Sequence, residues 1–484
     1  MNYRTLLYLL GQVALAVAAL MLVPFCLAFV FEEEKTPIAF GVTIAILAVI
    51  ALVAFLCRPK NRELNGRSGF LAVAIAWIFL SLMGSLPFSL SGAIPDYIDC
   101  LFETVSGFTT TGATILADIE SMPKSLLMWR SITQWIGGMG VLVFIIAILP
   151  KGDPGVIHLI KAETPGPQFG KLVSKLRFSA RILYAIYVAL TILEAILLLI
   201  GGMDVFDAFL HAFSTAAAGG FSSKTLSIGG YESLYIEIVV TIFMLIFSIN
   251  FNLFYLIIIG RVASVVRSEE LRAFLIIVAS SILAISVSLT VNKVYNGFGE
   301  ALRYSSFQVA AIISTTGFAT ADYTTWPLMA QIILICLMFI GGCQGSTAGG
   351  LKVSRIVILF KSGLRNVTKT VSPRAVINVK LDGKALSEDV VDNVNSYIVL
   401  YMMIFFASLI MISINTNMGF QENFSAVTSC LNNVGPGLGS INPYGTFGDF
   451  SIFSKLVLIF DMLLGRLEIL PMLLLFYPKA WRRI

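Results

Sequence analysis

The chain has 484 residues, of which 57% are hydrophobic and 13% charged, with a formal net charge of +5. Its mean hydropathy is +0.88, whereas a soluble protein of this length carries roughly a quarter charged residues. These values exclude an ordinary soluble protein and indicate a polytopic membrane protein, because several apolar runs reach the roughly 20 residues that cross a bilayer core.

Two apolar runs, near residues 6–30 and 36–57, predict an N-terminal pair of transmembrane helices. The first run lacks a convincing cleavage site, so we expect a retained helix and not a removed signal peptide.

Four units follow, and each combines an apolar span, a short segment ending in glycine and a second apolar span. The first spans lie near 69–90, 179–201, 271–293 and 394–416, and the second spans near 125–149, 233–260, 327–360 and 452–477. The predicted divisions are a helix pair at 1–66 and pore repeats at 67–160, 161–264, 265–385 and 386–484.

The short segments recur about every hundred residues, which indicates an internal repeat. They end in Phe108–Gly112, Ala216–Gly220, Ser314–Gly317 and Leu431–Gly435. At about 12 residues each segment is too short to span the bilayer, which favours a re-entrant half-helix. Asp99 and Asp207 stand at the starts of two segments and predict helix caps, and attraction of cations to the outer mouth is compatible with that role.

The charges of the loops alternate along the chain. The basic loops and the C-terminus contain Arg58, Lys60, Arg62, Arg67, Lys151, Lys161, Lys171, Lys175, Arg177, Arg261, Arg267, Arg272, Lys361, Arg365, Lys369, Arg374, Lys380, Lys384, Lys479, Arg482 and Arg483. The loops between them contain Glu32, Glu33, Glu34, Asp96, Asp99, Asp118, Glu120, Asp204, Asp207, Asp322 and Asp449. By the positive-inside rule, the basic loops and both termini are expected to be cytoplasmic.

The repeated segments predict an ion filter made of backbone carbonyls. After a half-helix ends within the membrane, an extended stretch can turn its carbonyl oxygens toward the axis, and glycine permits the backbone angles required. Carbonyl oxygens that replace water suit a weakly hydrated monovalent cation such as K⁺. The alternative is that each segment is a small-residue site for helix packing, but four copies on one side of the membrane argue against it.

With these residues the chain resembles the Trk/Ktr/HKT superfamily of potassium uptake proteins, and within it the bacterial Trk-type membrane subunits (TrkH/TrkG type). The resemblance covers essentially the whole chain and also rests on Ala162–Pro167, Gly341–Gly350 and Gly465–Glu468. It implies an all-α polytopic membrane protein with four pseudo-fourfold helix–pore-helix–helix repeats around a central pore. It also implies K⁺ at the carbonyls of Thr110, Thr111, Gly112, Ala218, Gly219, Gly220, Thr315, Thr316, Gly317, Asn433, Val434 and Gly435. The second repeat departs most, because it has alanines where others have hydroxyls.

The segment Gly341–Gly350 has five glycines in ten residues of an apolar span. Each glycine costs a helix about 1 kcal/mol relative to alanine, so we expect a break there. Packing against a neighbouring helix is the alternative explanation. The resemblance implies an intramembrane loop that gates below the filter, formed by Gly341, Gly342, Gly345, Ser346, Thr347, Gly349 and Gly350.

Arg466 lies in the last apolar span, where a charge costs at least about 2.5–3.5 kcal/mol. Glu468 is a poor intrahelical partner, because residues two apart point to different faces of a helix. One explanation is an ion pair with another helix. The other, suggested by the resemblance, is that Arg466 faces the pore just inside the filter and raises the barrier to cations.

We expect neither an enzyme nor a bound cofactor, because the sequence has no P-loop and no metal-ligand or catalytic pattern. The expected function is uptake of K⁺ across the bacterial cytoplasmic (inner) membrane through a gated, channel-like pore. The alternative is a carrier that couples K⁺ to H⁺ or Na⁺, although carriers usually have inverted repeats. The resemblance also implies a homodimer and a cytoplasmic nucleotide-binding regulatory subunit (TrkA-like). The basic stretch Arg365–Lys384 is either its docking surface or only a positive-inside anchor.

Overall fold

The computed structural model describes residues 3–57, 66–140, 173–375, 377–414 and 418–481. This part of the chain is helical except for loops and one antiparallel hairpin of β1 (Lys380–Leu381) and β2 (Lys384–Ala385). The prediction of an all-α polytopic membrane protein is therefore confirmed. The Ala162–Pro167 motif, most of the first two basic loops and the end of the span predicted at 125–149 lie outside the described residues.

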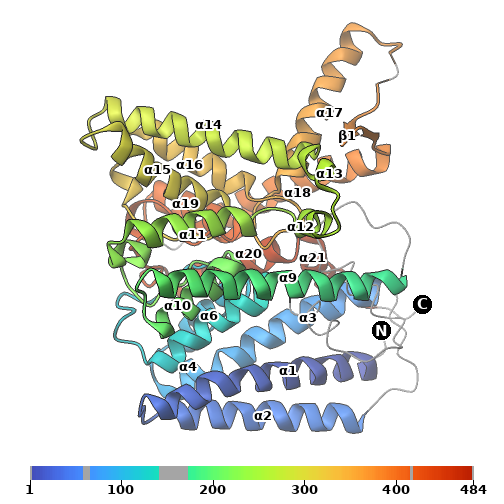
Figure 1. Ribbon diagram of the computed structural model, residues 1–484. Coiled ribbons are helices and arrows are strands. Elements are labelled where there is room, and N and C mark those ends of the chain that lie inside the picture. Colours follow the sequence, from blue (N-terminus) through green and yellow to red (C-terminus); the bar gives the residue numbers. More distant parts are fainter. Residues whose placement is uncertain (1–2, 58–65, 141–172, 376, 415–417, 482–484) are drawn as a thin grey trace.

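The N-terminal helix pair consists of α1 (Tyr3–Val30) and α2 (Thr36–Leu56), which lie side by side (Figure 1). Gly11 permits their close approach, because a Cβ at this position would overlap the Ala54 side chain. The outward face of α2 carries exposed apolar side chains such as Val49 and Leu52. Lipid, and not water, is the medium in which such a face is stable.

The helices of the four predicted repeats follow in chain order. Repeat 1 contains α3 (Gly66–Gly84), α4 (Leu86–Ser91), α5 (Tyr97–Phe108) and α6 (Lys124–Gly138). Repeat 2 contains α9 (Val173–Ile200), α10 (Val205–Ala217), η1 (Ser227–Tyr231), α11 (Leu234–Phe247), α12 (Phe251–Ile258) and α13 (Val262–Val266). Repeat 3 contains α14 (Glu269–Val291), α15 (Phe298–Ile313), η2 (Tyr323–Thr325), α16 (Leu328–Ile340) and α17 (Val353–Val371), followed by the hairpin. Repeat 4 contains α18 (Glu388–Ser413), α19 (Phe420–Asn432), η3 (Gly439–Ile441), α20 (Ile452–Arg466), α21 (Leu470–Leu475) and α22 (Pro478–Trp481).

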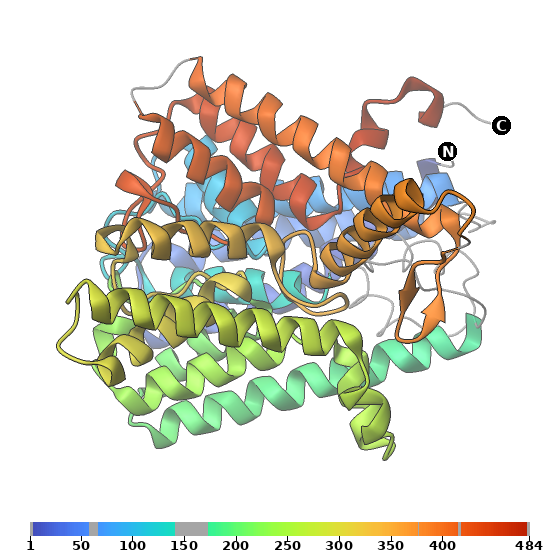
Figure 2. The same cartoon turned by 90° about the horizontal axis from the view of Figure 1, so that it is seen from above.

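The long helices run roughly along one direction, with α1 and α2 at one side of the molecule and α14 at the other (Figure 1). Within the described residues, six helices are long and apolar enough to cross a membrane, and the bent pair α11–α12 makes a seventh candidate. Both termini lie at the end of the molecule from which α17 projects (Figures 1 and 2). This arrangement fits an even number of crossings.

The short helices α5, α10, α15 and α19 are the predicted half-helices, and each ends immediately before a filter segment. The caps of two of them differ from the prediction. Asp96 and Asp204, and not Asp99 and Asp207, cap α5 and α10 by accepting backbone N–H groups at 2.7 and 3.1 Å. Asp99 lies one turn further and forms an ion pair with Lys455 of α20 at 2.6 Å. The prediction was wrong because each half-helix starts a few residues earlier than its apolar pattern.

The second spans do not continue as single helices. The α11 and α12 axes differ by 91°, and α16 ends at Ile340, just before Gly341, whose φ is +71°. The last span breaks after Arg466, where Glu468 and Ile469 adopt left-handed angles of +57° and +64°. The predicted break at Gly341–Gly350 is therefore confirmed, whereas the breaks after α11 and α20 were not predicted.

Candidate ion path and gate

The first residue of each filter triplet has a left-handed backbone, an uncommon conformation for residues other than glycine. The φ angles are +55° at Thr110, +57° at Ala218, +57° at Thr315 and +55° at Asn433. Four residues of three different types share this angle, so the position in the repeat, and not the side chain, sets it. The backbone is thus repeated fourfold even where the sequences differ.

The third residue of each triplet is a glycine that is also left-handed, with φ of +80° at Gly112, +77° at Gly220, +74° at Gly317 and +103° at Gly435. The middle residue is not left-handed in any of the four triplets. Alternation of left-handed and ordinary residues flips alternate peptide planes, which lets successive carbonyls share one side of the strand. This is the backbone geometry that a carbonyl-lined ion path requires.

The four triplets form a closed ring. A Cβ on the glycine of one triplet would overlap the carbonyl oxygen of the middle residue in the next triplet. The contacts run from Gly112 to Gly219, from Gly220 to Thr316, from Gly317 to Val434 and from Gly435 to Thr111. Since the last contact returns to the first repeat, the four repeats surround one axis in sequence order. All twelve predicted filter residues therefore lie at one centre.

A side chain of the first repeat holds the second triplet, which lacks hydroxyls of its own. Gln134 of α6 donates from Nε2 to the carbonyl of Gly219 at 2.6 Å and accepts from the N–H of Phe221 at 3.2 Å. In the first triplet, by contrast, Thr111 Oγ1 lies 2.8 Å from the hydroxyl of Thr109. A glutamine from a neighbouring element thus replaces the missing local hydroxyl.

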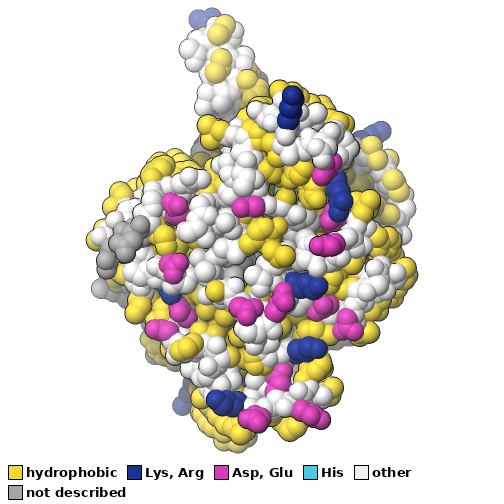
Figure 3. Space-filling model, turned by 90° about the vertical axis from the view of Figure 1, so that its left-hand side faces the viewer, with side chains coloured by type: hydrophobic (Ala, Val, Ile, Leu, Met, Phe, Trp, Pro, Cys, Tyr) yellow, Lys and Arg dark blue, Asp and Glu magenta, His cyan; other side chains and the backbone are white. Residues whose placement is uncertain are grey.

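A cavity lies immediately beyond the ring, and all four third-position glycines line it. The lining consists of Gly112, Ala113, Thr114, Ile119, Arg130, Gly220, Phe221, Ser222, Lys224, Thr225, Ser227, Gly317, Gly435, Pro436, Ile441, Asn442, Pro443, Gly445 and Phe447. Figure 3 looks onto this end of the molecule, where acidic side chains are more frequent than basic ones. An acidic mouth attracts cations and raises their local concentration.

The two cations that line this cavity have partners. Lys224 Nζ donates to the carbonyl of Gly230 at 3.1 Å and lies 4.3 Å from the centre of the Tyr231 ring. Tyr231 in turn donates to Asp207 Oδ2 at 2.7 Å. Burial raises the pKa of the Tyr231 phenol, so this hydroxyl keeps its proton and remains a donor. The Lys224 ammonium is therefore held at the wall of the cavity.

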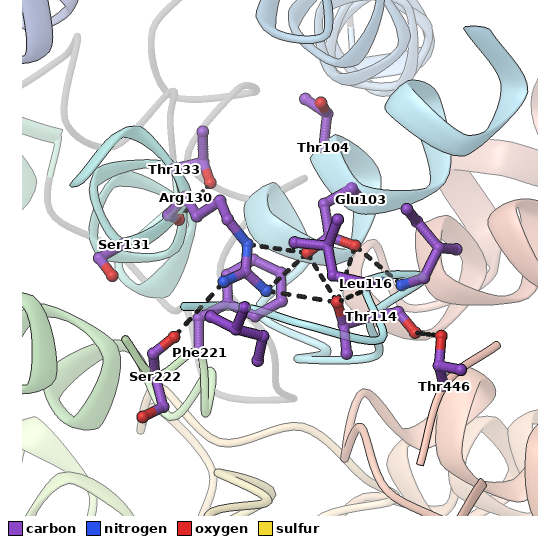
Figure 4. Close-up of polar contacts among 12 residues, drawn as sticks. Glu103, Thr104, Thr114, Leu116, Arg130, Ser131, Thr133, Phe221, Ser222 and Thr446 are labelled. Atoms are coloured by element: carbon purple, nitrogen blue, oxygen red, sulfur yellow. Dashed lines mark hydrogen bonds and ion pairs between the residues drawn. The ribbon is translucent and has the colours of Figure 1, made fainter. Parts of the chain in front are cut away.

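Arg130 forms a buried ion pair with Glu103 behind the first triplet (Figure 4). The two side chains are only 2% and 0% exposed, and Arg130 Nη2 lies 2.6 Å from Glu103 Oε1. Glu103 also accepts from Thr114 Oγ1 at 3.1 Å and from the N–H of Ile115 at 3.0 Å. Arg130 Nη1 donates to the carbonyl of Ser222 at 3.4 Å. The pair thus joins α5 and α6 to the segments that leave the first and second triplets.

The same network reaches the fourth repeat. The carbonyl of Thr114 accepts from Thr446 Oγ1 at 3.2 Å (Figure 4). It also accepts from the N–H of Phe447 at 2.9 Å. The Arg130 guanidinium also stacks 3.9 Å from the centre of the Phe221 ring. Repeats 1, 2 and 4 therefore contact one another around this ion pair. The pair helps to position the segments that follow the first and second triplets.

On the opposite side of the ring, the segment Gly341–Gly350 forms a loop whose two arms pair with each other. Leu351 donates to the carbonyl of Phe339 at 3.0 Å, and Lys352 to that of Ile340 at 2.9 Å. The loop donates three hydrogen bonds to other segments. They run from Thr347 N to Phe247 O (3.4 Å), from Gly349 N to Thr315 Oγ1 (2.6 Å) and from Gly350 N to Asn432 O (3.1 Å). The loop thus touches a filter residue and the ends of elements from repeats 2 and 4.

Arg466 completes this layer. Its Nη1 donates to the carbonyl of Thr347 at 3.0 Å, and its Nη2 donates to the carbonyls of Gly137 and, at 2.6 Å, Gly138. These three backbone acceptors belong to the loop and to the end of α6. The described partners of Arg466 are thus carbonyl oxygens on either side of the path, and the loop and Arg466 together connect all four repeats beneath the ring.

Two more cations lie beside Arg466. Lys352 is 6% exposed and donates to the carbonyl of Ala348 within the loop. Arg355 pairs with Glu468 at 2.6 Å. Glu468 thus pairs with α17 and not with Arg466, as its spacing predicts. Beneath the ring, Arg466 and Lys352 thus contribute positive charge, whereas Glu468 offsets the charge of Arg355.

The sequence alone did not identify Glu103, Arg130, Gln134 or Lys352. The signals were present, since Arg130 and Gln134 interrupt a predicted membrane span and Lys352 follows a glycine-rich break. Their partners lie far away in the sequence, so only the fold pairs them.

A family model described as "Cation transport protein" (TrkH) matches residues 36–483. The Trk system potassium uptake protein TrkH of Escherichia coli (strain K12) is 36% identical over 485 residues, which are 100% of both chains. TrkI of Halomonas elongata is 31% identical, with 100% of this chain and 98% of TrkI covered. The crystal structure of the potassium transporter TrkH from Vibrio parahaemolyticus matches with a TM-score of 0.90 and 34% identity, and 100% of both chains are covered. The chain belongs to the TrkH family of cation transport proteins.

Proposed function

We propose that this chain is the membrane subunit of a potassium uptake system and conducts K⁺ through a gated, channel-like pore. The relatives that cover the full chain are named as potassium uptake proteins. The observation that carries the proposal is the closed ring of four triplets with left-handed first residues and glycines. Parallel repeats around one axis favour a channel, because coupled carriers usually have inverted repeats.

The proposed selectivity filter is formed by the backbone carbonyls of the four triplets, from Thr110–Gly112, Ala218–Gly220, Thr315–Gly317 and Asn433–Gly435. Carbonyls held by a buried framework replace the water around K⁺ without adding a charged ligand. The framework includes the Glu103–Arg130 pair and Gln134. The acidic outer end then supplies cations to the filter.

The proposed gate is the loop Gly341–Gly350 together with Arg466. The loop's small residues leave few side-chain contacts to hold it, so it can move as a unit. Its hydrogen bonds to Thr315 and Asn432 support a position directly beneath the filter. The guanidinium of Arg466 adds an electrostatic barrier to the steric one.

We further propose that the protein lies in the bacterial inner membrane with both termini in the cytoplasm. Both termini lie at the same end as the basic α17 and its hairpin, in accord with the positive-inside rule. This end is the proposed docking surface for a cytoplasmic nucleotide-binding subunit. A homodimer with one pore per subunit is part of the same proposal.

The test is current or flux measured with purified protein in liposomes. A reversal potential that follows the K⁺ gradient alone is expected for a channel. A reversal potential that shifts with pH or Na⁺ would instead support a coupled carrier. The parallel test is growth of a K⁺-uptake-deficient bacterium at low external K⁺, and an inserted protein that restores no growth together with its regulatory subunit would contradict the proposal.

A further inference from the structure

Glu270 lies in the first turn of α14, outside the triplets and outside the loop, yet its carboxylate binds the loop directly. Its Oε1 accepts from the N–H of Gln344 at 2.6 Å and from the N–H of Ser354 at 3.2 Å. The residue is only 9% exposed, so water competes weakly for these contacts. Hydrogen bonds from amides to a carboxylate are about twice as strong as those between neutral groups.

The two amides belong to opposite arms of the loop. Gln344 lies near its start, and Ser354 is the second residue of α17, ten residues later. A further hydrogen bond, from Ser354 Oγ to Gln344 Oε1 at 2.9 Å, joins the same two residues. One carboxylate oxygen therefore joins the two arms of the loop, which also contacts Thr315 and Arg466.

The preceding residue, Glu269, binds the other structure at this end of the molecule. Its side chain pairs with Lys361 of α17, and its N–H donates to Asp382 Oδ1 of the hairpin at 2.7 Å. Lys361 Nζ also donates to the carbonyl of Lys380 at 2.8 Å. Adjacent residues of one helix turn thus bind the loop with the start of α17, through Glu270, and the α17–hairpin unit, through Glu269. This unit projects from the rest of the molecule (Figures 1 and 2).

An acidic residue in the first turn of a helix is common, because it complements the helix dipole. That role does not account for Glu270, since Ser268 already caps α14 and the Glu270 carboxylate is directed to amides of another segment. Its two acceptor contacts are both with the loop and the start of α17. The geometry therefore indicates a role in the position of the loop.

We propose that Glu270 is a latch for the gate, a positioning residue that holds the loop closed and couples it to the α17–hairpin unit through Glu269. A cytoplasmic partner that moves this unit would pull on the first turn of α14 and weaken the latch. The inference rests on the proposed gating function and adds to it the residue through which regulation reaches the loop.

The test compares Glu270→Gln with Asp389→Asn in the full chain, reconstituted in liposomes without any partner. Glu270→Gln keeps the shape of the side chain but removes its charge, so K⁺ flux should rise about fivefold or more, at the lower end of ordinary couplings between sites. The ratio of K⁺ to Na⁺ permeability should stay unchanged, because the triplets are intact. Asp389→Asn removes an exposed first-turn carboxylate of α18 and should leave both quantities unchanged.

Hydrogen exchange of the peptide that covers Gly341–Ser354 provides a second readout. Its amides should exchange faster in Glu270→Gln than in the unmodified chain, with no change in α5 or α10. If Glu270→Gln does not fold, Glu270→Asp keeps the charge with a shorter reach and should show the same changes to a smaller degree. Unchanged flux and exchange in a folded Glu270 variant, beside a leaky Arg466→Ala, would overturn the latch while leaving the proposed gate intact. If Arg466→Ala also leaves flux unchanged, the gate proposal itself fails.

Discussion

At the scale of single residues, the third position of each triplet has the strictest requirement in the ion path. Its φ angle is positive in all four repeats, and any Cβ would overlap a carbonyl oxygen of the next repeat. Glycine therefore satisfies two separate requirements at this position: it adopts a positive φ angle without strain, and it has no Cβ to overlap the neighbouring carbonyl. A change at one glycine also disturbs the carbonyl of its neighbour, so its effect spreads around the ring.

We expect Gly317→Ser to lower the preference for K⁺ over Na⁺. The left-handed backbone costs a non-glycine residue about 1–2 kcal/mol, and the new Cβ would push against the carbonyl of Val434. Relative permeabilities from reversal potentials in liposomes would measure the change. Gly299→Ser is the matched control, because a Cβ there meets no atom within 4 Å. Gly112→Ser should act as Gly317→Ser does, and unchanged permeabilities in both would contradict the filter assignment.

The ion pair of Glu103 and Arg130 should reveal itself in a double-mutant cycle. Arg130→Gln leaves a buried carboxylate without its cation, which costs about 3–5 kcal/mol, whereas the double variant with Glu103→Gln should recover much of this loss. Thermal unfolding in detergent would measure both. The control pair is Arg303 and Glu237, where Arg303 is 34% exposed and the expected coupling is smaller. Additive losses for the buried pair would show that the two side chains act independently.

At the scale of elements, the breaks in the second spans determine the shape of the path. The break after α16 could be predicted, because five glycines in ten residues cannot maintain a helix. The bend after α11 could not, since the sequence there has no glycine or proline, and Asn250 acts as a cap of α12. The half-helices were also predicted, but not their caps, because an apolar pattern does not define the first turn. The polar partners of Arg466 and Glu468 depend on tertiary contacts that one sequence does not reveal.

We expect removal of the gate to increase K⁺ flux in the absence of a regulatory subunit. Arg466→Ala removes a charge beneath the filter, and a reduction of the barrier by about 1.4 kcal/mol would raise the rate tenfold. Deletion of the middle of the loop, from Gly345 to Thr347, removes the tip and should act in the same direction. Flux per protein in liposomes would measure both. Arg261→Ala, which removes an exposed cation near α13, is the control. A poorly folded Arg466→Ala with no gain in flux at matched protein amount would favour a structural role for this arginine.

At the scale of the whole molecule, a fourfold backbone carries four different sets of side chains. The position seven residues before the first residue of each triplet is Glu103, His211, Gln308 or Ala426. Three of these four side chains bind the strand that leaves their own triplet, through Ile115, Ser222 and the carbonyl of Ala321 respectively. At this position three repeats therefore share one structural role, which is to bind the segment after their own triplet, although the residue types differ. This explains why the fourfold pattern of the fold was predictable from glycines, whereas the supporting contacts were not.

The orientation of the molecule is testable with a thiol reagent that does not cross membranes. The exposed native cysteines Cys26, Cys57 and Cys336 would first be replaced by alanine. Ser121→Cys, at the acidic end, should then react from outside intact cells, because that end faces outward under the positive-inside rule. Lys384→Cys, on the hairpin, should react only in inside-out vesicles, and each variant serves as the control for the other. The reverse pattern would place the basic end outside, and cations taken up by the cell would then meet the gate before the filter.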